Sequence, residues 1–166
     1  MRGKMVNETH TKRRAILIFT LNRSGVLNKI ASLIRRKMRN VDTITACATQ
    51  QPGISRMTIT LREDSDDKML QVAKQIEKLT EVISAKELDI DQSFWREVAI
   101  VKFEADGAHL EQLRKNHALE ILVRQNNEVC VAQVAGTSQV VDSFMQEIGK
   151  EKIIEVARSG FTAMEK

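Results

Sequence analysis

The residues with the clearest chemical potential are Asn22, Ser24 and Gly25, which lie together in a short polar turn. The segment before the turn, 15–21, is typical of a buried strand, and the segment from Val26 onward is typical of an amphipathic helix. The turn therefore places a side-chain amide, a capping hydroxyl and a glycine backbone at a helix start. Free N–H groups and the positive end of the helix dipole make such a start a favourable position for a carboxylate.

Two interpretations of this turn remain open from its spacing. In the structural interpretation, Ser24 caps the helix and Gly25 only permits a tight turn. In the functional interpretation, Gly25 lets a ligand approach the backbone, while the N–H groups of Val26 and Leu27 face the carboxylate of that ligand. Short Asn-x-Ser-Gly turns are common, so the pattern weights the two interpretations evenly.

Side chains that could form a catalytic or metal site are scattered along the chain. His10, His109 and His117 have no metal-ligand spacing to cysteines or carboxylates, and no glycine-rich phosphate loop is present. Three acidic residues are expected to cap a helix and interact with its dipole rather than to bind metal: Asp64, Asp66 and Asp67. We therefore expect no catalytic residue and no metal site, and a chain that senses a small anionic molecule.

The composition is that of a soluble globular protein, with 42% hydrophobic and 29% charged residues among 166. No apolar run approaches the ~20 residues that span a bilayer, and the first ten residues lack the apolar core of a signal peptide. Cys47 and Cys130 lie far apart in apolar, strand-like stretches, which predicts two reduced core cysteines. We expect a cytoplasmic protein with no membrane partner.

Positive charge is concentrated in residues 1–40, which hold eleven Lys or Arg and the single acid Glu8. Such a segment could contact nucleic acid or an acidic protein surface. The alternative is a flexible basic leader, 1–13, followed by the solvated face of a helix. Aromatic residues make up 4% of the chain and Tyr is absent, so the stacking platforms of single-strand binders are missing. We favour the leader and do not expect nucleic acid as a partner.

The chain divides into two similar halves, each with the order strand, helix, strand, strand, helix, strand. In the first half, strands are predicted at 15–21, 41–49, 54–61 and 81–88, and helices at 26–38 and 66–79. In the second half, strands are predicted at 98–103, 119–125, 129–135 and 153–158, with a hairpin turn at Asn126-Asn127, and helices at 108–116 and 138–148. This order is the split βαβ pattern of ferredoxin-like α+β domains.

An ordered series of short segments runs through roughly residues 13 to 164. The segments are 21–27, 40–44, 52–59, 75–79, 96–97, 135–138 and 155–160. Together they resemble the acetolactate synthase small-subunit family, whose N-terminal part is an ACT domain. The resemblance implies an α+β fold of two ferredoxin-like βαββαβ domains: an amino-acid-binding ACT domain at 14–91 and a C-terminal small-subunit domain at 92–166.

The resemblance also implies a function. In this family the chain is a non-catalytic regulatory subunit that activates a large thiamine-diphosphate enzyme and confers feedback inhibition by valine in branched-chain amino-acid biosynthesis. The effector lies between two ACT domains of a homodimer, where one wall matches the turn of one protomer and the other matches a segment of its neighbour. The effector-binding residues implied in this way are Asn22, Ser24, Gly25, Val26, Leu27, Asn40 and Val41.

The residue chemistry agrees with a free amino acid as effector. Its carboxylate needs donors, which the helix start supplies, and its ammonium needs acceptors, which the amide oxygens of Asn22 or Asn40 would provide. Val26 and Val41 would line an apolar pocket that suits a branched aliphatic side chain. Valine or a related branched-chain amino acid is therefore the expected effector.

The resemblance implies no cofactor in this chain and places thiamine diphosphate, magnesium and FAD in the large partner subunit. Two other functions stay open: a free-standing ACT-type amino-acid sensor that acts on nucleic acid or another protein, and an enzyme with an unrecognised site. Met38 and Arg39 stand where the family has a glycine-containing pair after the first helix. Because glycine provides a left-handed helix cap, we expect a different exit from this helix.

Overall fold

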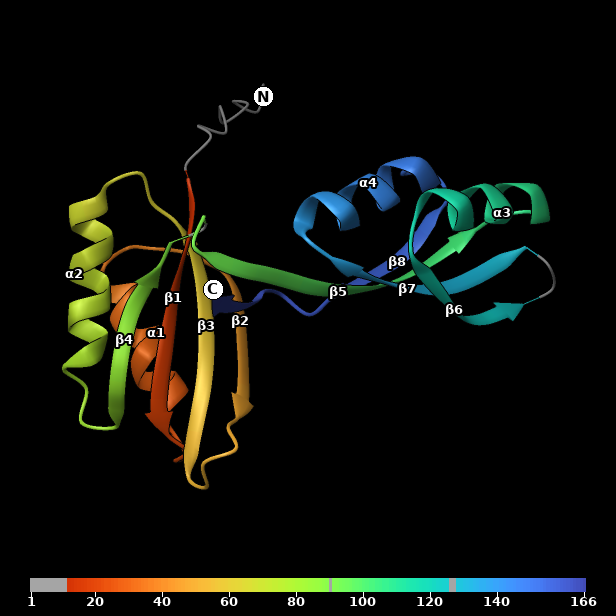
Figure 1. The fold of residues 1–166 in the computed structure, drawn as a ribbon. Coiled ribbons are helices and arrows are strands. Elements are labelled where there is room, and N and C mark those ends of the chain that lie inside the picture. Colours follow the sequence, from red (N-terminus) through yellow and green to blue (C-terminus); the bar gives the residue numbers. More distant parts are fainter. Residues whose placement is uncertain (1–11, 90, 126–127) are drawn as a thin grey trace, which may run out of the picture. The chain divides into compact units, whose positions relative to one another are not determined.

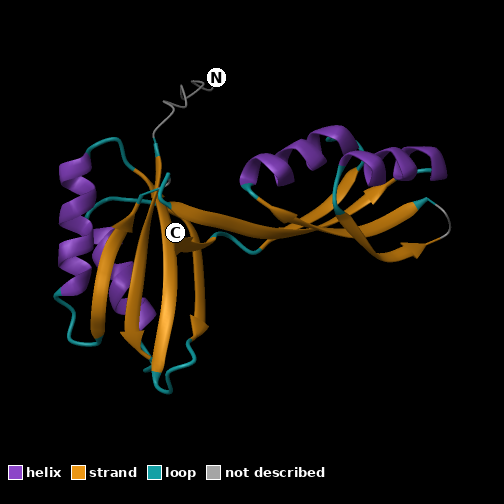
Figure 2. Ribbon diagram, viewed as in Figure 1, coloured by secondary structure: helices purple, strands orange, loops and turns teal. Residues whose placement is uncertain are grey.

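The structure, a computed structural model, describes residues 12–89, 91–125 and 128–166. The predicted leader at 1–13, apart from its last two residues, lies outside the described part, as do His10 and the turn Asn126-Asn127. The chain forms two compact units, one ending at Ser93 and one from Phe94 to Met164 (Figures 1 and 2). Within the described residues, no helix is long and apolar enough to cross a membrane.

The first unit is a four-stranded antiparallel sheet with two helices on one face (Figure 1). Its elements are β1 (Arg13–Leu21), α1 (Val26–Arg36), β2 (Val41–Ala48), β3 (Ile54–Arg62), α2 (Asp66–Glu77) and β4 (Val82–Leu88). The strand order is β2-β3-β1-β4, so β1 and β3 are central and β2 and β4 are the edges. This arrangement confirms the predicted ferredoxin-like fold.

The second unit repeats this plan with one additional strand. Its elements are β5 (Ser93–Glu104), α3 (Gly107–Asn116), β6 (Leu119–Gln125), β7 (Val129–Gly136), α4 (Ser138–Ile148), β8 (Ile153–Arg158) and β9 (Thr162–Glu165). The order is β6-β7-β5-β8, and β9 also pairs with β5. β9 was not predicted from the sequence, and β5 begins five residues before its predicted start at Val98, because Arg96 and Glu97 interrupt the apolar pattern.

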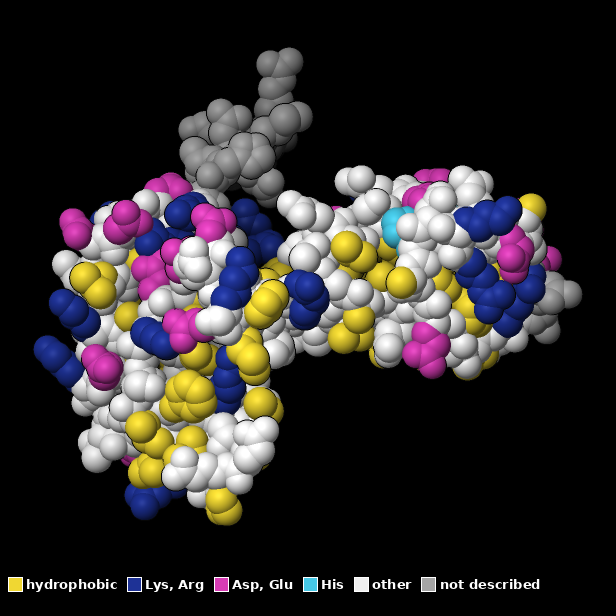
Figure 3. Space-filling model, viewed as in Figure 1, with side chains coloured by type: hydrophobic (Ala, Val, Ile, Leu, Met, Phe, Trp, Pro, Cys, Tyr) yellow, Lys and Arg dark blue, Asp and Glu magenta, His cyan; other side chains and the backbone are white. Residues whose placement is uncertain are grey.

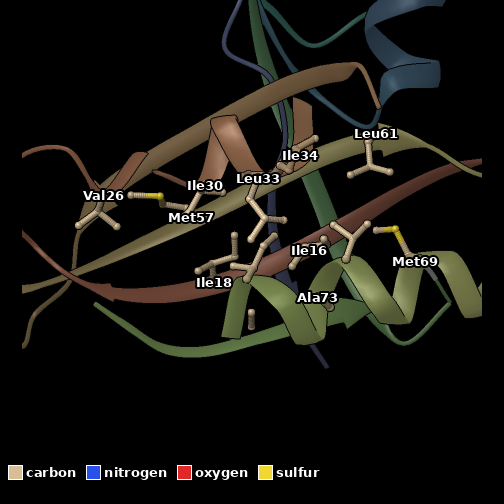
Figure 4. Packing of buried hydrophobic residues seen from close by; sticks show 14 residues of the cluster. Ile16, Ile18, Val26, Ile30, Leu33, Ile34, Met57, Leu61, Met69 and Ala73 are labelled. Carbon is tan, nitrogen blue, oxygen red and sulfur yellow. The ribbon is translucent and has the colours of Figure 1, made fainter. Parts of the chain in front are cut away.

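The first core lies between the sheet and the two helices (Figure 4). The amphipathic pattern of α1 predicts an apolar stripe made of Val26, Leu27, Ile30, Leu33, Ile34 and Met38. This stripe is confirmed at four positions, Val26, Ile30, Leu33 and Ile34. It is wrong at Leu27, which is 43% exposed, and at Met38, which is 93% exposed. Leu27 lies in the first helical turn outside the buried core, and Met38 lies beyond the end of the helix.

The two cysteines have different environments. Cys130 is buried in the second core and free, as predicted, and burial raises the pKa of its thiol. Cys47 is exposed, so its predicted core position is wrong. It lies on the edge strand β2 opposite Arg56 of β3, on the sheet face that the helices do not cover.

The N-cap of the second helix is a serine rather than an aspartate. Ser65 is the N-cap of α2, and its hydroxyl accepts the N–H of Lys68 at 3.4 Å. Asp66 and Asp67 occupy the first turn, where negative charge stabilises the helix dipole. The prediction that the acidic stretch serves the helix is confirmed for the dipole, while the capping is done by Ser65.

The exit of α1 has the hydrogen bonds of a glycine cap without the glycine. Met38 has φ of +56°, and its N–H donates to the carbonyl of Arg35 at 2.8 Å. The N–H of Arg39 donates to the carbonyl of Ile34 at 3.4 Å, which completes a Schellman motif. The expectation of a different exit is therefore wrong: the backbone keeps the left-handed cap and Met38 bears its strain.

Met38→Gly is expected to stabilise the first unit by about 0.5–1 kcal/mol. A left-handed conformation costs a residue with a Cβ about 1–2 kcal/mol, and glycine avoids this cost. Glycine also raises the conformational entropy of the unfolded chain, which offsets part of the gain in stability. The exposed Met38 side chain loses almost no packing on removal. Urea unfolding measures the effect. Met38→Ala is the control and should match the wild type, because alanine keeps the Cβ.

Glu147 joins α3 to α4 beside the second core. Its carboxylate accepts from Asn116 Nδ2 at 2.7 Å and lies 2.8 Å from His117 Nε2. The His117 ring packs edge-on against Phe144, with 5.4 Å between ring centroids. The hydrogen bond from Asn116, and then that from His117, lowers the pKa of Glu147 below its ordinary value of 4.5.

Glu147→Ala is expected to cost about 1–2 kcal/mol of stability at neutral pH. A carboxyl whose pKa is lowered by folding stabilises the protein above its unfolded pKa, and that contribution disappears as pH falls through the folded value. The difference from wild type should therefore shrink below about pH 4.5. Urea unfolding at neutral and acid pH measures it. Glu111→Ala, which removes an exposed acid of α3, should change stability little at either pH.

Candidate effector site

The first candidate wall is the turn 22–27 between β1 and α1. Gly25 is the N-cap of α1 with φ of +83° and ψ of −10°, and no side chain caps the helix. The predicted capping role of Ser24 is therefore wrong, because the left-handed Gly25 stands between Ser24 and the helix. A Cβ placed at Gly25 would meet nothing within 4 Å. The start of α1 thus has no side-chain cap and has open space beside Gly25, two features that suit a carboxylate site.

Hydrogen bonds hold the first wall to two neighbouring turns. The N–H of Asn22 donates to the carbonyl of Gly53 at 2.7 Å, and the N–H of Leu21 donates to the carbonyl of Glu81 at 2.8 Å. Lys29 of α1 forms an ion pair with Glu81 and donates a hydrogen bond to it. This hydrogen bond is the main cause that lowers the pKa of the Glu81 carboxyl. The side chain of Asn22 is exposed, so its amide is available to a ligand.

The second candidate wall is Asn40 and Val41, where the chain enters β2. Arg39, just before it, forms an ion pair with Glu63, whose side chain is 7% exposed. Asp42, just after it, accepts from Arg62 Nε at 3.1 Å. The wall is thus held on both sides by the end of β3. These ion pairs were not predicted from the sequence, because each joins residues that lie far apart in it.

The two walls lie at opposite ends of the first sheet. Leu21, just before the first wall, pairs with Ile54 of β3, whereas Val41 pairs with Leu61 of the same strand. Ile54 and Leu61 are seven positions apart, about 23 Å at the rise of an antiparallel strand. A single chain therefore does not bring the two predicted walls together.

The apolar candidates differ in what they can offer a ligand. Val26 is 2% exposed and belongs to the first core, and Val41 is partly buried against that core. Leu27 is half exposed and lies in the first turn of α1. The apolar surface of the first wall is therefore Leu27, whereas the sequence analysis assigned it to Val26.

Other candidate chemistry has structural explanations. Within the described residues, no group of three His, Cys, Asp or Glu could hold a metal ion. His117 contacts Glu147 through its Nε2 and packs its ring edge-on against Phe144. His109 lies 3.3 Å from Lys152 Nζ through Nδ1 and 3.4 Å from the carbonyl oxygen of Glu147 through Nε2.

Two family models match the chain in succession. Residues 16–84 match the AHAS small subunit-like ACT domain, and residues 96–166 match the small subunit of acetolactate synthase. The two matches fall on the two units of the fold and on most of the described residues.

Whole-length relatives agree with both matches. The chain is 34% identical over 158 residues to the acetolactate synthase isozyme 3 small subunit of Salmonella typhimurium, covering 92% of this chain and 94% of the relative. It is 28% identical over 155 residues to the acetolactate synthase small subunit of Bacillus subtilis, covering 91% and 89%. The crystal structure of the acetolactate synthase small subunit from Thermotoga maritima superposes with a TM-score of 0.84 at 26% identity, covering 93% and 98%. The chain therefore belongs to the acetolactate synthase small-subunit family, and its N-terminal half is the ACT domain of that family.

Proposed function

We propose that this chain is the cytoplasmic regulatory subunit of an acetolactate synthase, that it activates the large catalytic subunit, and that it confers inhibition by valine or a related branched-chain amino acid. The small-subunit family to which it belongs is regulatory rather than catalytic. Thiamine diphosphate, magnesium and FAD belong to the large subunit in this proposal. One observation carries the effector role: the N-cap of α1 is Gly25, no side chain caps this helix, and the space beside Gly25 is open.

A homodimer of the ACT domains would assemble the effector site. The described β2 is an edge strand, and its segment from Thr43 to Ala48 carries no charge, whereas the other edge, β4, carries Lys86 and Glu87. An unprotected edge strand is a template for pairing with another copy, and charges protect an edge from it. We therefore place the dimer contact at β2.

Antiparallel pairing of two β2 strands would reverse one copy relative to the other. The Asn40 end of the second copy then lies at the Ala48 end of the first. Ala48 pairs with Ser55, next to the pair formed by Ile54 and Leu21. The second wall of one copy would thus approach the first wall of the other. A site made of both walls needs two copies in this way, because the two walls of one chain lie at opposite ends of its sheet.

The two walls offer complementary groups to a free amino acid. The first-turn N–H groups of α1 would bind the carboxylate, and the amide oxygen of Asn22 or Asn40 would bind the ammonium. Leu27 would contact the aliphatic side chain. The charges of Arg39 and Asp42 are held by Glu63 and Arg62, which leaves an uncharged pocket that favours a small apolar side chain.

Reconstitution with the purified large subunit tests this function. The wild-type chain should raise acetolactate formation from pyruvate and make it sensitive to valine, and the chain alone should form none. Asn22→Ala should raise the valine concentration for half inhibition by about ten- to a hundredfold and leave activation intact. Ser32→Ala, a polar truncation on the following helix α1, is the control. An active complex that ignores valine would disprove the effector role, and copurifying nucleic acid in place of the enzyme would favour a free-standing sensor.

A mixed dimer tests whether the site is shared between chains. Asn22→Ala and Asn40→Ala should each disable both sites of a homodimer. When the two variants are mixed, one site of each heterodimer carries both changes and the other is intact. Valine binding measured by calorimetry should therefore return to about one site per mixed dimer. A mixture with no recovered binding would show that both residues act within one chain.

A further inference from the structure

The second wall is flanked by ion pairs on both sides. On one side, Arg39 pairs with Glu63. On the other side, Asp42 accepts from Arg62 Nε at 3.1 Å and lies 3.6 Å from Arg13 Nε. Figure 3 shows positive and negative side chains intermixed over the end of the first unit at which β1 begins. The arginines next to the second wall are thus held by acids of the same unit.

Glu63 is a buried and firmly held carboxylate. Its side chain is 7% exposed, its Oε1 accepts the N–H of Ser65 at 3.0 Å, and its own N–H donates to the carbonyl of Lys12 at 3.0 Å. Ser65 is the N-cap of α2, so this carboxylate belongs to the connection between β3 and α2. Arg39 therefore reaches a fixed anion that lies outside the second wall.

Stability alone does not account for the pair of Arg39 and Glu63. Burying two charges costs about as much free energy as their attraction returns, and an apolar pair of similar size is often as stable. The pair lies, however, where a charge would act on a ligand. Arg39 directly precedes Asn40, and a guanidinium on the neighbouring residue can lie within about 10 Å of it, which is about one Debye length. Without its partner, Arg39 would place a positive charge beside the effector site.

We propose that Glu63 and Asp42 restrict the effector to amino acids with an uncharged side chain, because they neutralise the arginines on either side of the second wall. Glu63 acts through Arg39. Asp42 acts through Arg62, so both acids are positioning residues and neither touches the effector. The inference rests on the proposed function, which supplies the effector site. It goes further by naming the ligands that this site rejects: an acidic side chain finds no free positive charge there.

Glu63→Gln tests this inference through the selectivity of the site. Glutamine keeps the size of the side chain and the acceptor for the N–H of Ser65, and it frees the charge of Arg39. The full-length variant is loaded with valine, and aspartate and its neutral isostere asparagine are compared as competitors by calorimetry. Relative to wild type, aspartate should gain about fivefold over asparagine. This is the effect of one unit charge about 10 Å away, at a screening between those of water and a protein surface.

Glu97→Gln is the matched control. Among the described residues, Glu97 is the other buried glutamate, and it pairs with Arg158 in the second unit. The same substitution there removes an equal charge from a buried ion pair, yet it should leave the ratio of aspartate to asparagine affinity unchanged. In the double variant of Arg39→Met with Glu63→Gln, neither charge of the pair remains, so the wild-type ratio should return. A general loss of stability would move none of these ratios.

Asp42→Asn extends the test to a less buried position. The Asp42 side chain is 19% exposed, so the fold tolerates this change more readily, and aspartate should again gain over asparagine. Circular dichroism checks the fold of each variant. A wild-type ratio in folded Asp42→Asn, and in Glu63→Gln where it folds, would overturn the inference and leave the effector role standing. A wild-type chain that binds no valine would overturn the proposed function itself.

Discussion

Gly25→Asp is expected to abolish valine inhibition of the reconstituted enzyme, whereas Gly25→Asn should retain most of it. Both side chains tolerate the left-handed conformation that Gly25 adopts, and both would enter the same open space. They differ in one negative charge at the position proposed for the effector carboxylate. Two like charges about 4 Å apart repel by roughly 4 kcal/mol near a protein surface, which is about a thousandfold in affinity.

The pair of variants separates charge from shape. Any cost of the added side chain or of the strained backbone is common to both, so the ratio of their half-inhibitory valine concentrations reports the charge alone. We expect the Asn variant to lie within about tenfold of wild type. Equal sensitivity of the two variants would place the effector carboxylate elsewhere. High salt should narrow the difference between them, because exposed charges are screened.

Arg158→Met is expected to destabilise the second unit by about 3–5 kcal/mol, since it leaves a buried carboxylate without its partner. Glu97 of β5 has a side chain that is only 1% exposed, and Arg158 of β8 donates to its Oε2 at 3.0 Å and to its Oε1. Arg158 also donates to Asp142 of α4 at 2.8 Å. The hydrogen bond to Glu97 is the main cause that raises the pKa of Arg158 above its ordinary value.

Glu97→Gln should rescue much of this loss when it is combined with Arg158→Met, because a neutral amide is cheaper to leave buried than a charge. The single tryptophan, Trp95, packs edge-on against Phe161 within the second unit and reports its unfolding by fluorescence. Asp142→Ala is the control and should cost under about 1 kcal/mol, because half of the Asp142 side chain is exposed. A similar loss of unfolding free energy for Arg158→Met and Asp142→Ala would argue against a buried ion pair between Arg158 and Glu97.

The sequence predicted most of the fold because its apolar periodicity is regular. The strand predicted at 54–61 is β3, Ile54–Arg62, and the helix predicted at 138–148 has the bounds of α4. Prediction failed where long-range contacts decide the structure. β9 is four residues long and pairs with β5, and the early part of β5 contains the buried Glu97, whose partner Arg158 lies far away in the sequence.

The candidate site was also predicted only in part, because local patterns locate a helix start but do not reveal long-range contacts. The local signal at Gly25 was sufficient to locate a helix start with a bare backbone. The ends of a helix are less predictable: capping by Ser24 was one of two interpretations that the sequence left open, yet the N-cap is Gly25. Similarly, Met38 adopts a left-handed conformation that residue type argues against. Ion pairs such as that of Arg39 with Glu63 join residues far apart in sequence, so no local pattern announces them.

The distance between the two walls has a consequence for how such a chain would respond in the cell. If each complete site needs two copies, effector and self-association stabilise each other by mass action. At low concentration the chain would be both less dimeric and less sensitive, and added valine would drive dimer formation. The apparent sensitivity of the enzyme would then depend on how much small subunit the cell makes, so that expression level sets the threshold of feedback.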